Sequence, residues 1–196
     1  TVIGQAHKQP DIAEEWLIFS RAVSTKDGRH AGDVELAFSL EADRAPQQER
    51  ITRIARSPLA AFFPTVVETH LGFLVQGPYR TTPSRDNVPR GDAWNQHLLR
   101  ETAALLERSL RWLRDNDRLD TEALRCLPLD ATKFGESSMF APLYEATKSA
   151  LSTDALLPRY DLGHVPAAVA RLGRTQELRD LLTPVQLGRL YGDGGE

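Results

Sequence analysis

The sequence predicts an α+β protein in which an antiparallel sheet is covered by a long helix and followed by a helical subdomain. Three observations lead to this prediction. Short segments up to residue 77 alternate apolar and polar residues, as strands with one buried face do. One long segment, Ala93 to Asp115, then carries apolar residues at helical spacing. After Asn116, prolines divide the chain into short helical segments.

The first two strands are expected to form a hairpin. Residues 1–14 are polar and mixed, and we expect them to be a linker. Glu15 to Ser24 reads as a strand that has four residues on one side: Trp16, Ile18, Ser20 and Ala22. Residues 26–33 are rich in turn formers. Val34 to Leu40 is the second strand, because its apolar residues alternate with Glu35, Ala37 and Ser39.

Shorter strands are expected to complete the sheet. Arg50 to Arg56 fits either a short helix or a strand, and we favour a strand because Pro58 follows closely. Leu59 to Phe63 is apolar and aromatic and predicts a short buried strand. Leu71 to Gln76 alternates again before Gly77 and Pro78 end it.

The long helix should pack on this sheet. Asp92 stands at its N-cap position, where a carboxylate accepts the free N–H groups of the first turn. The apolar stripe consists of Trp94, Leu98, Thr102, Leu105, Leu106, Leu110 and Leu113. Further short helices are expected at Thr121–Cys126, Met139–Ser149, Pro166–Leu172, Thr175–Leu182 and Pro184–Tyr191. We therefore divide the chain into a linker (1–14), an α/β domain (15–118) and a helical subdomain (119–196).

Composition argues against several classes of protein. The net charge of −3 gives no basic field for nucleic acid or an anionic membrane. No apolar run approaches the roughly 20 residues of a membrane-spanning helix. Cys126 is the only cysteine, which excludes an internal disulfide and fits a cytoplasmic location. The histidines are scattered, so the sequence predicts no metal site, and no catalytic motif is complete.

The segment from Tyr79 to Gly91 is the strongest candidate for a binding site. It holds three arginines (Arg80, Arg85 and Arg90) among Thr81, Thr82, Ser84 and Asn87. A guanidinium group presents a planar pair of donors to phosphate, so a loop of this composition between a strand and a helix suits an anion. The alternative is a solvated connector whose arginines pair with nearby carboxylates.

The segment Phe62 to Pro89, FFPTVVETHLGFLVQGPYRTTPSRDNVP, is followed by Trp94-Asn95 and a Leu-rich helix. It resembles the region just after the ATP-binding domain in sacsin-like, heat-shock-chaperone-type ATPases of the GHKL superfamily, which have bacterial and mainly actinobacterial relatives. This resemblance implies a transducer-like domain of ribosomal-protein-type α/β fold. The domain would couple nucleotide state to conformational change or client binding.

The resemblance also implies site residues and partners. Arg85, in Ser84-Arg85, corresponds to the arginine that these chaperones supply to the γ-phosphate, and Arg80 is the second candidate. Thr82, Ser84 and Asn87 would support the loop. The nucleotide-pocket motifs are not in this chain, so ATP and Mg²⁺ are expected in an upstream domain of a parent protein and no cofactor within these residues.

The remaining expectations concern partners. The upstream domain is the first, and a protein client or a second copy of the chain is the other. The alternative function is a non-catalytic protein-interaction or dimerisation module. A third hypothesis, a nucleic-acid-binding β-domain, fits Phe73, Tyr79 and the arginines, but the net charge of −3 argues against it.

Overall fold

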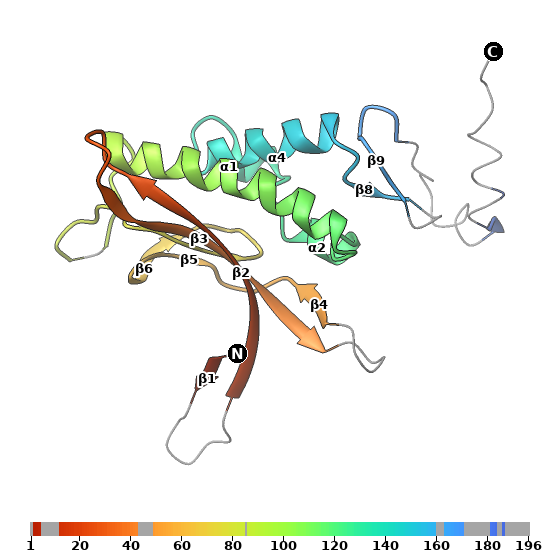
Figure 1. Ribbon diagram of the computed structural model, residues 1–196, viewed down its shortest axis with the longest axis horizontal. Helices are drawn as coiled ribbons and strands as arrows, with labels where there is room; N and C mark the ends of the chain where they lie inside the picture. The colour runs from red at the N-terminus through yellow and green to blue at the C-terminus, as the bar shows by residue number, and fades with distance from the viewer. Residues whose placement is uncertain are drawn as a thin grey trace. The chain divides into compact units, whose positions relative to one another are not determined.

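Figure 1 shows the computed structural model, which describes residues 2–4, 12–42, 49–84, 86–159, 163–170, 181–183 and 186. The chain divides into two compact units, residues 1–149 and 150–196. Helices α2 (Thr121–Arg125) and α3 (Ala131–Phe134) belong to the first unit. The sequence instead suggested a boundary after residue 118. The difference has a physical reason, because Arg50 of β4 pairs with the α2 N-cap Asp120 and the Gly72 N–H donates to the Cys126 carbonyl at the end of α2.

The described residues of the first unit form one seven-stranded sheet, in the order β1-β2-β3-β7-β5-β6 with β4 paired to β3. Its strands are β1 (Val2–Gly4), β2 (Ile12–Ser24), β3 (His30–Ala42), β4 (Glu49–Thr52), β5 (Pro58–Ala61), β6 (Phe63–Glu68) and β7 (Leu74–Gln76). The pairs are antiparallel except β5 with β7, which is parallel. The predicted α+β class, with an antiparallel sheet and a long helix, is confirmed.

The β2–β3 hairpin is confirmed, but β2 is longer than expected, and its more buried side is the one opposite Ile18, Ser20 and Ala22. Strands β1 and β2 extend into residues 1–14, which were expected to be a linker. Pairing places Phe19 opposite Leu36. The Phe19 ring meets Trp112 edge-on, with ring centroids 5.3 Å apart, whereas Ile18 is 56% exposed. The pairing register, which local alternation does not reveal, therefore selects the buried side.

Strands β4 and β7 are shorter than expected, because the backbone between them forms hydrogen bonds outside the sheet. The run from Arg50 is a strand only as far as Thr52, and the run from Leu71 is a strand only from Leu74. Between them, Gly72 accepts a hydrogen bond from Ile54 N (3.2 Å) and donates one to the Cys126 carbonyl (2.9 Å). Gly72 thus joins the end of α2 to the β4–β5 connection instead of extending β7.

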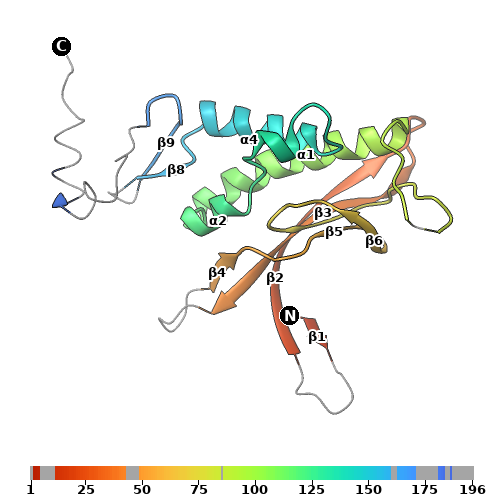
Figure 2. The same ribbon diagram turned by 180° about the vertical axis from the view of Figure 1, so that it is seen from behind.

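Helix α1 (Ala93–Asp115) has the predicted bounds and lies across one face of the sheet formed by β2 and β3, as Figures 1 and 2 show. Asp92 caps it by accepting hydrogen bonds from Trp94 N and Asn95 N (2.9 and 3.0 Å). The core residues with essentially no exposed surface include Leu98, Leu105, Leu106, Leu110 and Leu113 from α1, Val34, Leu36, Phe38 and Val75 from the strands, and Phe73 just before β7. Each such side chain contributes about 1.5–3 kcal/mol by leaving water.

The end of the chain differs from the prediction where it is described. Helix α4 spans Ala141–Thr153, close to the expected helix at 139–149. Strand β8 (Leu157–Pro158) pairs with β9 (His164–Val165). A helix was predicted at Pro166–Leu172, but residues 167–169 form a turn, so the prediction is wrong for its described part. The last two predicted helices fall almost entirely outside the described residues.

Candidate functional site

The arginine-rich segment, residues 79–91, is held by one buried side chain of α1. Asn95 has no exposed surface, and its amide bonds the loop at two separate points. Its Oδ1 accepts from Arg80 N (2.8 Å), and its Nδ2 donates to the carbonyls of Arg80 (2.9 Å) and Pro89 (3.1 Å). Both ends of the segment are therefore fixed to the helix. Local sequence pattern alone does not indicate this role of Asn95.

The approach to the loop is also fixed. Trp94 Nε1 donates to the Pro78 carbonyl (2.9 Å). Tyr79 is buried, and its hydroxyl lies 3.1 Å from Thr102 Oγ1. Since Thr102 donates its own proton to the Leu98 carbonyl, the Tyr79 hydroxyl is the donor. Burial raises the pKa of Tyr79 to about 12, against a smaller lowering effect of the Thr102 hydrogen bond.

The middle of the loop is closed by its own polar side chains. Thr82 Oγ1 donates to Asp86 Oδ1 (2.6 Å), and it accepts from Asn87 N (3.1 Å). Hydrogen bonds from Thr82 and then Ser84 lower the pKa of the Asp86 carboxyl. All three predicted support residues thus stabilise the loop itself, although Ser84 and Asn87 are exposed to solvent.

The three arginines stand in different situations. Arg85 lies outside the described residues. Arg80 is exposed and pairs with Asp92 (Nη1 to Oδ2, 3.2 Å), as the solvated-connector interpretation expects. The Asn95 N–H, with smaller contributions that include Arg80, lowers the pKa of Asp92. Arg90 Nη1 donates to the Ser137 carbonyl (2.9 Å), which links the end of the loop to the segment before α4.

Two clefts share lining residues, and one of them lies beside the loop; we call them together the basic groove. The larger, of about 390 Å³, is lined by Asn87 and Arg90 from the loop together with residues from elsewhere in the first unit. The smaller, of about 310 Å³, is lined by Arg53 and Arg56. Both clefts are also lined by Glu68, His70 and Lys133. Sequence reasoning missed this groove because its residues come from separate segments.

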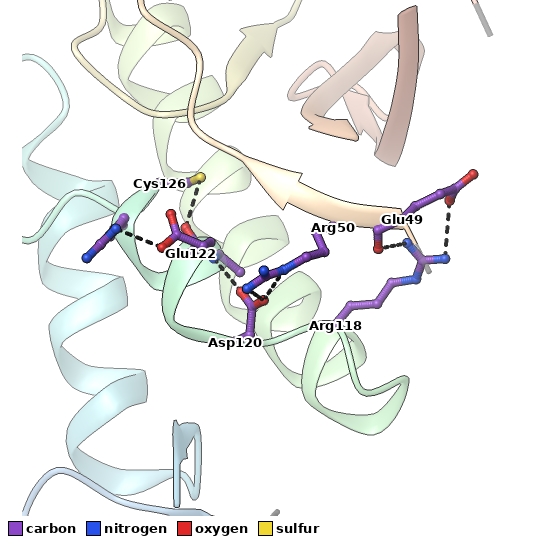
Figure 3. Close-up of polar contacts among 8 residues, drawn as sticks. Glu49, Arg50, Arg118, Asp120, Glu122 and Cys126 are labelled. Atoms are coloured by element: carbon purple, nitrogen blue, oxygen red, sulfur yellow. Dashed lines mark hydrogen bonds and ion pairs between the residues drawn. The ribbon is translucent and has the colours of Figure 1, made fainter. Parts of the chain in front are cut away.

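Cys126 is a structural residue in this fold. Figure 3 shows it at the end of α2, where its thiol lies 3.5 Å from the Glu122 carbonyl. Ion pairs of Arg50 with Asp120 (3.0 Å) and of Arg118 with Glu49 (3.3 Å) join β4 to the residues before α2. Burial raises the pKa of the thiol to about 12, so it is protonated at neutral pH. It therefore lacks the thiolate that a nucleophilic cysteine needs.

Among the described residues, no three His, Cys, Asp or Glu side chains are grouped so that they could hold a metal ion. No described helix is both long and apolar enough to cross a membrane. Comparison with known protein families, with curated proteins and with solved structures finds no match to this chain.

Proposed function

We propose that this chain is the middle, transducer-like part of a sacsin-like, chaperone-type ATPase. It would couple the nucleotide state of an upstream ATP-binding domain to a conformational change or to client binding. The observation that supports this proposal best is the attachment of the arginine-rich segment to α1 through Asn95. A movement of the segment would be transmitted to the helix, and through the helix to the sheet.

In this proposal Arg85 acts on ATP held by the upstream domain of the same chain. A guanidinium group placed at the γ-phosphate stabilises the charge that develops during phosphoryl transfer, an effect of about 10³–10⁵ in rate for arginine fingers. A fixed loop reduces the reorganisation that this contact costs. Arg80 is the second choice because Asp92 already pairs with it. ATP and Mg²⁺ would be bound by the upstream domain.

The test uses a chain that contains the ATP-binding domain together with these residues. We expect Arg85→Ala to lower steady-state ATP turnover by at least about tenfold, with ATP affinity nearly unchanged. Arg29→Ala is the matched control, because Arg29 is an exposed arginine on the β2–β3 turn. Equal turnover of the Arg85→Ala and Arg29→Ala proteins would rule out the catalytic role.

An exposed aromatic turn favours a second candidate, a non-catalytic dimerisation module. Phe62 lies between β5 and β6, Phe63 is the first residue of β6, and they are 76% and 66% exposed. Phe62 adopts a φ of 62°, which is costly for a bulky side chain. Strand β6 is at the edge of the sheet, where a second copy could pair with it. Sedimentation velocity of the wild type and of Phe62→Ser/Phe63→Ser tests this candidate by their oligomeric states. A wild-type dimer that becomes a monomer in the double variant supports it, and a wild-type monomer contradicts it.

A further inference from the structure

We infer that the basic groove binds an oligophosphate anion, in addition to any role of Arg85. The groove is assembled by the first unit alone, from four places in the chain. They are the β4–β5 connection, the β6–β7 connection, the end of the arginine-rich segment, and α3 with the residues after it. The inference does not rest on the proposed function, because none of its residues is needed for catalysis in an upstream domain.

The charge of the groove is opposite to that of the chain. Arg53, Arg56, Arg90 and Lys133 line it against one carboxylate, Glu68, so its net charge is +3 with His70 neutral. The whole chain carries −3. Charges of one sign in a cleft focus the electrostatic potential and raise the local concentration of the opposite ion. The groove is therefore a local anion site on an acidic protein.

Three of the four cations of the groove are available to a ligand, whereas Arg90 donates to the Ser137 carbonyl. Arg21, Arg50, Arg114 and Arg118 each form an ion pair with a carboxylate. In the described part of the chain, Arg53, Arg56 and Lys133 form none, and all three are exposed. The Asp130 carboxylate, three residues before Lys133, is engaged at the start of α3 by the N–H and hydroxyl of Thr132 (2.9 and 2.6 Å).

The single carboxylate of the groove is turned to the backbone. Glu68 Oε1 accepts hydrogen bonds from Ser57 N (2.6 Å) and more weakly from His70 N (3.4 Å). It thus binds the β4–β5 and β6–β7 connections together. Its place in the groove is explained by this structural role, and the cations are left to an external anion.

The wall of the groove is built on a strained and rigid turn. His70 has a φ of 61°, a conformation that is uncommon outside glycine and is found at functional sites. Buried hydroxyls hold this turn, with Thr69 Oγ1 donating to Ser57 Oγ (2.7 Å) and Ser57 Oγ donating to the Phe73 carbonyl (2.5 Å). Rigid walls keep the cations in place before a ligand arrives, which favours binding.

The distribution of the cations selects the class of ligand. Arg53 and Arg56 line one cleft, Arg90 lines the other, and Lys133 lines both. A single phosphate reaches only part of this set, whereas a chain of phosphoryl groups can engage both clefts. Guanidinium and ammonium groups are the donors that proteins use for such oxygens. The chain of phosphoryl groups could be a free oligophosphate or the tail of a nucleoside triphosphate.

Isothermal titration calorimetry, which measures the affinity of this chain for inorganic tripolyphosphate at low salt, tests the inference. We expect one-site binding that weakens at least about tenfold, or by about 1.4 kcal/mol, in Arg56→Glu/Lys133→Glu. Both substituted residues are exposed, so the variant should keep the wild-type thermal midpoint. Lys26→Glu/Arg29→Glu has the same change in charge at the β2–β3 turn and should bind as the wild type does. ATP serves as the second ligand: tighter binding than tripolyphosphate identifies a nucleotide tail, and equal or weaker binding identifies a free oligophosphate.

Three results would overturn the inference. They are no measurable binding by the wild type, equal weakening in the two double variants, and sulfate binding as tightly as tripolyphosphate. Each would mean that the protein has only diffuse charge at this place. None of them bears on ATP turnover by an upstream domain, so the proposed function would stand or fall separately.

Discussion

Removing the side chain of Asn95 should release the arginine-rich segment from α1. The Asn95→Ala substitution deletes three hydrogen bonds of 2.8, 2.9 and 3.1 Å. Each hydrogen bond contributes a net of about 1 kcal/mol, and the Arg80 and Pro89 groups left behind lose their partners. Water can reach part of this half-buried loop and offset the loss. We therefore expect the free energy of unfolding to fall by about 2–4 kcal/mol.

The Asn95→Asp substitution removes the amide donor of Asn95 with almost no change in side-chain volume. The carboxylate still accepts from Arg80 N, but an oxygen replaces the donor that faces the carbonyls of Arg80 and Pro89. It also places a charge where the wild-type side chain has no exposed surface. Asn95→Asp should therefore destabilise at least as much as Asn95→Ala.

Urea unfolding and amide hydrogen exchange measure this prediction. The exchange of the Arg80 amide should accelerate in Asn95→Ala, because its acceptor is lost. Asn116→Ala is the control: Asn116 Nδ2 donates to the Trp112 carbonyl (2.8 Å) at the exposed end of α1, and its loss should cost about 1 kcal/mol or less. If Asn95→Ala costs no more than this control and leaves the Arg80 amide protected, the attachment described here is wrong.

Three further predictions concern the contact of α2 with the sheet and the buried ionisable groups. In Gly72→Ala the new Cβ would lie 2.4 Å from Cys126 Cα, so thermal unfolding should show a loss of at least about 2 kcal/mol. Gly91→Ala, with nothing within 4 Å, should change stability by less than about 0.5 kcal/mol. Because the pKa of Cys126 is raised to about 12, a disulfide reagent at pH 8 should label the native protein far more slowly than the unfolded chain, and equal rates would contradict this. Because the pKa of Tyr79 is raised from 10.0 to about 12, the unfolded chain loses this proton first, and stability should fall between these pH values by up to about 1.4 kcal/mol per pH unit relative to Tyr79→Phe.

The sequence was most informative where structure is local. Helix α1 was predicted with its correct bounds because its apolar residues recur at helical spacing and Asp92 caps it. The β2–β3 hairpin followed in the same way from alternation around a turn. The buried side of β2 could not be predicted, since it depends on pairing with β3, which places Phe19 opposite Leu36.

Contacts between segments far apart in the sequence could not be predicted from local sequence pattern. Nothing near Gly72 indicates that its peptide bonds the end of α2 at Cys126. The basic groove likewise brings Arg53 and Lys133 together from separate parts of the chain. Asn95 carried a usable signal, because it lies three residues before Leu98 and therefore on the buried side of α1. A polar side chain at such a position usually has hydrogen-bond partners.

We propose that the arginine-rich segment presents Arg85 to ATP bound by an upstream domain. A single-turnover measurement in a chain that contains both parts tests it most directly, because it follows the cleavage of bound ATP separately from binding and product release. The proposal predicts that Arg85→Ala slows cleavage by at least about tenfold and that Arg29→Ala does not. Cleavage at the wild-type rate in Arg85→Ala would contradict the claim.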